Sequence, residues 1–147
     1  MKKLLSILSI CLVFISCTST PELIRVQVDE LITKGTGESR LKYFEDKPFT
    51  GVSFNTYEDG QLSSELTYKD GELDGLWQQW FENGQLEYEI NHKDDKFDGL
   101  FQKWYENGQL EYEWNYKDGE YDGLQKHWYE NGLLKEERFF KDGVKIN

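Results

Sequence analysis

The chain has 147 residues, of which 17 are Lys or Arg and 28 are Asp or Glu, and its formal net charge is −11. A negative field of this size repels phosphate backbones and anionic lipid surfaces, so nucleic acid is not expected as a partner. The 23 aromatic residues argue against an acidic disordered chain, because such chains are poor in Phe, Tyr and Trp. Length and composition together predict one ordinary domain with an aromatic core.

Residues 1–16 have the pattern of a secretory signal. Lys2 and Lys3 precede an apolar run over residues 4–15, which is too short for a permanent membrane-spanning helix. Ser16 and Cys17 end this run and resemble the lipobox of bacterial lipoproteins. The resemblance implies cleavage before Cys17 and lipidation of Cys17, with residues 17–22 as a lipidated N-terminus and short linker. The alternative is a plain signal peptide with an incidental Cys.

Cleavage after residue 16 leaves 15 basic and 28 acidic residues, a net charge of −13, and a single Cys. One Cys forms no intramolecular disulfide, so the domain depends on packing. A lipoprotein N-terminus, as the resemblance implies, carries enough acyl chains for stable anchoring. We therefore expect an exported protein that is lipid-anchored to a bacterial membrane, with the outer membrane or cell surface favoured over the inner membrane. The anchor is the only expected membrane contact.

The remaining sequence repeats with a period of 24 residues. The four copies, residues 51–74, 75–98, 99–122 and 123–147, begin with Gly and an apolar residue. Each continues to an aromatic-Glu-(Asp or Asn)-Gly block, and a second turn follows as Lys-Asp-Gly, except that Asp95 replaces Gly in the second copy. Residues 23–50 precede the array. Within them we expect a capping strand, a loop over residues 34–39, and a degenerate half-repeat over residues 44–50.

Asn-Gly and Asp-Gly between alternating apolar residues predict a β-hairpin in each copy. If Asn83 and Gly84 form a two-residue type I′ loop, Gln79 lies opposite Tyr88 and Trp77 lies opposite Ile90. This register places the side chains of one face inward, namely Trp77, Phe81, Leu86, Tyr88, Ile90 and, in the third copy, Leu110. It places the other face outward, with Gln78, Trp80, Glu87, Glu89 and Glu111. The sequence predicts an all-β fold, an elongated antiparallel β-meander of repeated hairpins in one open sheet.

The segment Gly-Leu-Trp-Gln-Gln-Trp-Phe-Glu-Asn-Gly-Gln-Leu at 75–86, with its repeats over residues 44–147, resembles the bacterial variant of MORN repeats. It also resembles the MORN-containing proteins grouped as the YwqK antitoxin family. The resemblance implies a repeat scaffold without a reactive group.

The inventory for catalysis is small, with His92 and His127 as the only histidines. His92 occupies the slot of Tyr68, Tyr116 and Phe140 and is interpreted as an aromatic substitute, whereas the slot of His127 accepts varied polar residues. We expect no enzyme activity and no cofactor. The acids of the second turns do not match the spacing of a Ca²⁺ loop, and turn chemistry explains Asp beside Gly, so no metal site is predicted.

Trp80, Trp104 and Trp128 recur at one hairpin position, where the first copy has Thr56. Strand spacing places them about 9 to 10 Å apart, as a candidate binding stripe. The hydrophobic effect predicts partial burial of these rings, and packing within the array is the alternative to ligand binding. The interpretation is a non-enzymatic, membrane-anchored scaffold for a protein partner. The alternatives are an antitoxin-like neutraliser of a cognate toxin and glycan binding through the stripe.

Overall fold

The computed structural model describes residues 23–35 and 40–146. The signal peptide, Cys17, the linker and residues 36–39 of the expected loop lie outside these residues. Within the described part, no helix is long and apolar enough to span a membrane. The described residues form a 3-10 turn and fourteen strands: η1 (Val28–Glu30), β1 (Ile24–Gln27), β2 (Ile32–Lys34), β3 (Leu41–Phe44), β4 (Lys47–Pro48), β5 (Gly51–Thr56), β6 (Leu62–Lys69), β7 (Glu72–Trp80), β8 (Leu86–Lys93), β9 (Lys96–Trp104), β10 (Leu110–Lys117), β11 (Glu120–Tyr121), β12 (Gly123–Trp128), β13 (Leu134–Lys141) and β14 (Val144–Ile146).

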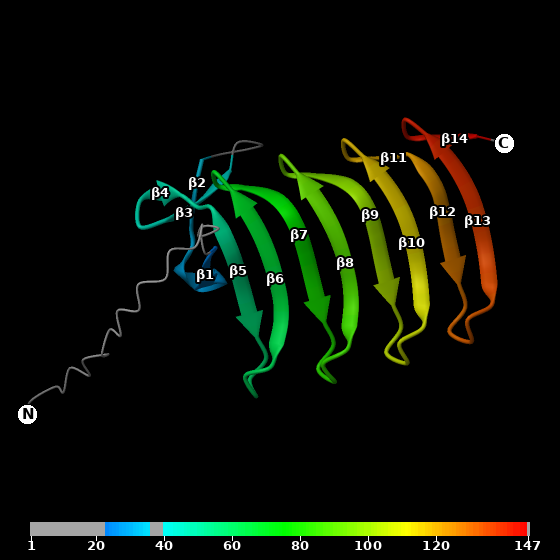
Figure 1. Cartoon of the computed structure of the whole chain (residues 1–147), viewed down its shortest axis with the longest axis horizontal. Helices are drawn as coiled ribbons and strands as arrows, with labels where there is room; N and C mark the ends of the chain where they lie inside the picture. The colour runs from blue at the N-terminus through cyan, green and yellow to red at the C-terminus, as the bar shows by residue number, and fades with distance from the viewer. Residues whose placement is uncertain (1–22, 36–39, 147) are drawn as a thin grey trace, which may run out of the picture.

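Eleven of the described strands form one sheet, in which β5 to β10 and then β12 to β14 lie side by side in chain order (Figure 1). The four copies are the hairpins β5–β6, β7–β8, β9–β10 and β12–β13, all antiparallel. The first turns line one edge of the array, at the bottom of Figure 1, and the second turns line the other. This architecture confirms the predicted meander of repeated hairpins.

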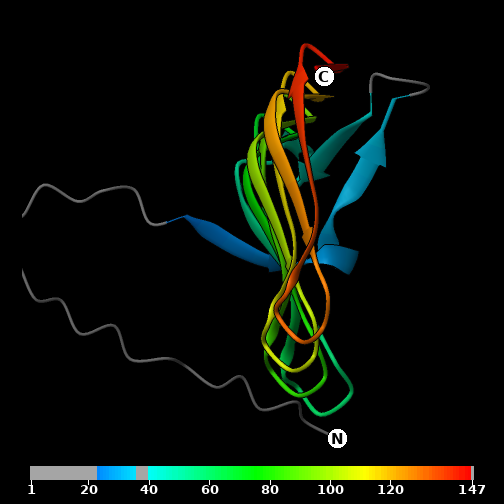
Figure 2. The same ribbon diagram turned by 90° about the vertical axis from the view of Figure 1, so that its right-hand side faces the viewer.

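The N-terminal segment adds a second, three-stranded sheet, β2–β3–β4, which a single-sheet expectation did not include. In Figure 2, β2 and β3 stand away from the plane of the main sheet. Strand β1 pairs with β5 in parallel and places Val26 opposite Ser53. The one cluster of buried apolar residues in the described part lies here, with Val26, Leu31, Phe49 and Tyr68. The main sheet is therefore covered at its N-terminal end, where the small sheet packs.

The first turns differ from the predicted two-residue type I′ loops. The backbone N–H of Gly84 donates to the carbonyl of Phe81 (2.9 Å), and the N–H of Phe81 donates to that of Gln85 (2.8 Å). Gly84 has a φ of +81°, whereas the φ of Asn83 is not positive. This is a type I turn followed by a left-handed Gly, the three-residue hairpin loop. The Asn83 side chain accepts the N–H of Gln85 (2.9 Å) and stabilises that turn.

The second turns have the type I′ geometry instead. Their two central residues both have positive φ, as at Asp70 (51°) and Gly71 (92°). Asp95, which replaces Gly in the second copy, keeps this conformation with a φ of 61°. Its N–H donates to the carbonyl of Leu73 (3.0 Å), and its carboxylate accepts the N–H of Leu73 (2.7 Å). The side chain thus supplies a contact that Gly lacks, and the substitution preserves the turn.

The expected register holds in the body of each hairpin and fails beside the first turn. Gln79 pairs with Tyr88 and Trp77 with Ile90, as predicted, but the register then shifts so that Trp80 pairs with Leu86. All four hairpins have this bulge. Directly paired residues share a face, so the assignment of Leu86 to the face of Tyr88 is wrong. The same shift places Leu110 opposite Trp104, and its inward assignment is corrected likewise.

The bulge also moves the acidic residue that follows the Leu. Glu87 accepts a hydrogen bond from the Gln79 amide (2.9 Å), and Glu111 forms an ion pair with Lys103 (2.8 Å). Gln79 and Lys103 occupy the same position in successive copies, on the face of Tyr88. The outward assignment of Glu87 and Glu111 is therefore wrong, because the extra residue in each bulge turns them toward the opposite side.

Candidate binding surfaces

One face of the main sheet, here called the aromatic face, is defined by a ladder of rings. Trp77 lies 5.5 Å from Tyr88, Phe101 stacks on Trp114 at 5.1 Å, and Tyr121 lies 5.2 Å from Phe140, all between ring centroids. The ladder is continuous from the second copy to the fourth, because each of these copies places rings on the same side of its strands. The further members of this face are Ile90, His92, Phe97, Tyr112, Tyr116 and His127. Successive copies are thus joined by ring packing as well as by backbone hydrogen bonds.

His92 packs in this ladder as its position predicts. Its ring lies 4.9 Å from Phe97 and 5.7 Å from Trp77, and 6% of the residue is exposed. Burial lowers the pKa of His92, with nearby Asp95 opposing the shift. The neutral form of the imidazole is therefore the one that suits this site. Burial and Lys135 likewise lower the pKa of His127, whose ring lies 4.3 Å from Tyr112.

The opposite face, here called the striped face, carries the three predicted Trp residues. Each lies across its hairpin from a Leu, in the pairs Trp80–Leu86, Trp104–Leu110 and Trp128–Leu134. All three Trp side chains are partly exposed, in agreement with the expectation of partial burial. Sequence analysis located the Trp stripe but missed the Leu residues that share it, since the bulge hides them from simple alternation.

Beside the Trp stripe runs a row of polar pairs. The Gln78 amide donates to Glu89 (3.0 Å), and the Gln102 amide donates to Glu113 (3.1 Å). In the last copy Lys126 replaces this Gln and lies 3.8 Å from Glu113. The striped face therefore combines an aromatic and aliphatic row with an amide and carboxylate row.

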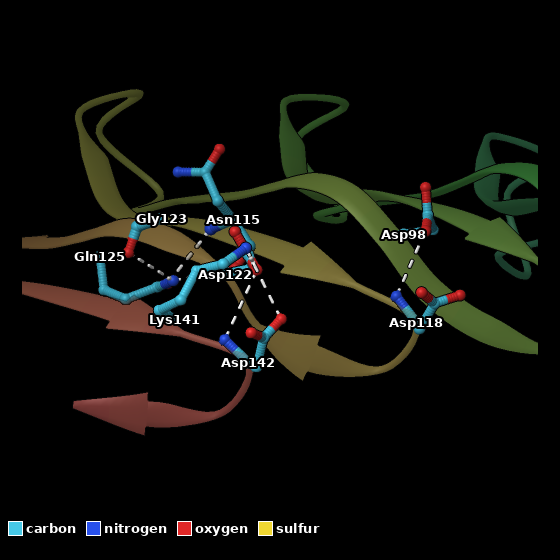
Figure 3. A network of polar contacts seen from close by, with 8 residues as sticks. All are labelled: Asp98, Asn115, Asp118, Asp122, Gly123, Gln125, Lys141 and Asp142. Carbon is cyan, nitrogen blue, oxygen red and sulfur yellow. Dashed lines mark hydrogen bonds and ion pairs between the residues drawn. The ribbon is translucent and has the colours of Figure 1, made fainter. Parts of the chain in front are cut away.

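The acids of the second turns bond to the array itself (Figure 3). The Asp98 carboxylate accepts the N–H of Asp118 (3.2 Å), and that of Asp122 accepts Lys141 Nζ (2.7 Å). The hydrogen bond from Lys141 lowers the pKa of Asp122. Among residues 23–35 and 40–146, no group of three or more His, Cys, Asp or Glu side chains is arranged to hold a metal ion.

Gln125 is a buried residue whose role sequence analysis missed. It is 6% exposed, and its side-chain oxygen accepts the N–H of Asn115 (3.1 Å) while its amide donates to the Asn115 carbonyl (2.9 Å) (Figure 3). The side chain thus takes the place of a backbone partner between β10 and β12, which pair only at Tyr112 and Glu113. The available signal was the replacement of Trp77 and Phe101 by Gln125 in the repeat.

Comparison with known proteins identifies the repeat. A family model described as MORN repeat variant matches residues 49–70, 73–94, 97–118 and 121–142. These matches keep the 24-residue period, include the first turn of each copy and end at the Asp that begins its second turn. No curated protein and no solved structure matches the chain.

Proposed function

Because the chain belongs to the MORN repeat variant family, we propose that it is a non-enzymatic scaffold that binds a protein partner through the Trp stripe. MORN repeats suggest a repeat-based binding or scaffold role. The partner, the contact surface and the membrane anchor are parts of this proposal. The single observation that carries it is the regular row of partly exposed Trp side chains, each beside a Leu, on the striped face.

The chemistry of the stripe suits a protein surface. Trp is enriched among the residues that dominate binding energies, and apolar side chains around it exclude water from the contact. The adjacent carboxylates, Glu65, Glu89 and Glu113, lie on the same face at one repeat position. With a chain charge of −11, they favour a partner with a basic rim and speed its approach at low salt.

The anchor completes the proposed arrangement. Lipidation of Cys17 would tether the domain to a membrane, while the acidic sheet itself avoids the anionic surface. The scaffold would then present its two faces to partners beside the membrane. An outer-membrane or cell-surface position is proposed on the basis of residues 1–17 alone.

The test is chemical crosslinking and capture from intact cells, with substitutions borrowed from the first copy. Trp104→Thr introduces the residue that the first copy has at this position, Thr56, and Tyr88→Ser introduces Ser64 on the aromatic face in the same way. We expect Trp104→Thr to lose the crosslinked partner and Tyr88→Ser to retain it, with circular dichroism verifying both folds. Equal capture by both variants would reject the Trp stripe as the contact surface. A glycan-array signal that only Trp104→Thr abolishes would instead support the glycan alternative.

A further inference from the structure

A hollow lies in the aromatic face between the third and fourth copies. Its volume is about 120 Å³, and four rings line it, those of Tyr112, Trp114, Tyr121 and Phe140. The polar residues that complete the lining are Gln125, Lys126, His127, Glu136 and Arg138. This surface is separate from the Trp stripe, because His127 and Tyr112 lie on the aromatic face.

The hollow exists because the fourth copy lacks rings that the second and third copies place in the ladder, above all the ring at the position of Gln125. In the second and third copies the equivalent position holds Trp77 and Phe101, whose rings contact Tyr88 at 5.5 Å and 6.3 Å. In the fourth copy the position holds Gln125, whose side chain bonds to the backbone of Asn115. The surrounding rings of the ladder remain, so the vacant space has walls built to pack against a ring.

The rim supplies charged groups that the earlier copies lack at these positions. Glu136 replaces Tyr88 and Tyr112, and Arg138 replaces Ile90 and Trp114. Arg138 Nε donates to Glu136 (2.6 Å), and the two side chains are 47% and 45% exposed. The pair is therefore positioned at the mouth of the hollow, with guanidinium donors still open to solvent.

We propose that the hollow receives the side chain of a tyrosine from an acidic segment of a protein partner. A cavity of about 150 Å³ accommodates a benzene ring, so a space of about 120 Å³ that is open at the rim admits a single ring. The phenol hydroxyl reaches the Arg138–Glu136 pair and forms a hydrogen bond there that an unsubstituted phenyl ring cannot form. This inference rests on the proposed protein-binding function, because the tyrosine comes from the protein partner.

The charge distribution makes the fourth copy the part of the array that an acidic segment can approach. Residues 51–122 contain 18 acidic and 5 basic residues, whereas residues 123–147 contain 4 acidic and 5 basic residues. Like-charge repulsion opposes the approach of an acidic segment to the first three copies, and it is absent at the fourth. The ring-sized hollow is thus located at the part of the array that tolerates this segment.

The probe is the peptide acetyl-Asp-Tyr-Asp-amide, titrated into the full-length protein and followed through the Trp indole and Arg Nε signals by NMR. A fragment of this size is expected to bind with a Kd on the order of 1 to 10 mM. Replacing its Tyr by Phe should weaken binding several-fold, and replacing it by Ala should abolish binding. The proposal would be overturned if the Ala peptide bound as well as the Tyr peptide. It would also be overturned if the Tyr peptide gave no response at concentrations about ten times the expected Kd.

Two Gln→Phe substitutions, one inside the hollow and one outside it, distinguish binding in the hollow from effects of an added ring elsewhere. Gln125→Phe restores the residue of the third copy and fills the hollow, so the Kd should rise at least tenfold. Gln102→Phe places the same ring on the striped face, where the first copy has Phe54, and should leave the Kd unchanged. Arg138→Ile, which restores the residue of the second copy, should remove the preference for Tyr over Phe. The assignment would be overturned if Gln125→Phe left the Kd of the Tyr peptide unchanged. It would also be overturned if Arg138→Ile left that Kd unchanged and still bound the Tyr peptide more tightly than the Phe peptide.

These outcomes are independent of the partner capture described above. If the peptide binds in the hollow and no partner is captured from cells, the proposed scaffold function fails while the hollow stands as a ring-binding site. If a partner is captured equally by the wild-type protein and Gln125→Phe and the peptide does not bind, the hollow fails while the scaffold function stands.

Discussion

Removal of one whole copy tests whether the array is built from equivalent, nearest-neighbour units. Deleting residues 99–122 joins Asp98 to Gly123, the same junction that Asp122 and Gly123 form in the intact chain. Each second turn docks on the preceding copy in the same way, since Gly119 N–H donates to the Phe97 carbonyl and Gly143 N–H to the Tyr121 carbonyl, at 2.8 and 2.9 Å. The deletion therefore preserves the turn, the bulge and the docking contact of every remaining copy.

The loss of stability follows from the size of the unit. Folded domains have a net free energy of unfolding of about 0.05 to 0.15 kcal/mol per residue, so a 24-residue copy contributes about 1 to 4 kcal/mol. The deletion removes the Phe101–Trp114 stack, whose centroids lie 5.1 Å apart. No ring pair replaces it, because the new interface between the second and fourth copies places Gln125 opposite Ile90. We expect the urea midpoint and the slope of the transition to fall while β-type circular dichroism per residue is unchanged.

Deletion of half a copy is the matched control. Removing residues 99–110 deletes all but the first three residues of β9, the turn that follows and the first residue of β10, so the rest of β10 comes almost directly after the second turn. Strand β10 normally runs parallel to β8, so its residues would enter the sheet reversed and out of register. This variant should aggregate or unfold. If both deletions fail to fold, the core is cooperative across all copies, and the reasoning from independent hairpins is refuted.

Four further perturbations test individual contacts. Ile90→Ala, at a residue 2% exposed, should lower the free energy of unfolding by about 2 to 5 kcal/mol in a urea titration. Glu111→Ala removes the ion pair between Lys103 and the Glu111 carboxylate, whose side chain is 15% exposed. The free energy of unfolding should fall by about 1 kcal/mol, whereas no measurable change would be expected if Glu111 faced solvent. Burial lowers the pKa of His92 in the folded protein below its unfolded value of 6.5. As the pH drops below 6.5 the unfolded chain therefore binds the proton first, and the free energy of unfolding falls until the folded pKa is passed. His92→Tyr should remove this dependence, which has a slope of up to about 1.4 kcal/mol per pH unit, from a series of unfolding measurements at different pH. Cys17→Ser should abolish metabolic lipid labelling without altering the circular dichroism of the domain, and persistent labelling would contradict lipidation at Cys17.

The repeat period was enough to predict the hairpins and most of their register. Apolar and aromatic residues at every second position specify which side of a strand faces the ladder, and the pairs Trp77–Ile90 and Gln79–Tyr88 follow from that rule. The pattern also predicts the partial burial of Trp104. These features depend on local alternation, which sequence reports directly.

The features that escaped prediction depend on choices between turns of similar composition. Asn83-Gly84 suits a type I′ loop and also a type I turn with a left-handed Gly, and the structure has the second. That choice, with the bulge beside it, moves Leu86 and Glu87 to opposite faces from those expected. The second sheet escaped for another reason: strands of two to four residues carry too little alternation to distinguish them from loops.

The same geometry explains where specificity can reside in such an array. Each copy repeats the preceding one two strands further along the sheet, so every repeat position becomes a row across a face. Rows that keep one residue type, such as the Trp stripe, provide a continuous contact surface. A departure from a row creates a local site without disrupting the sheet when the new side chain supplies the contacts that the neighbouring strands lose. Gln125 is such a departure: its side chain bonds to the backbone of Asn115, and the absence of a ring at this position leaves a hollow that the surrounding rings of the ladder line.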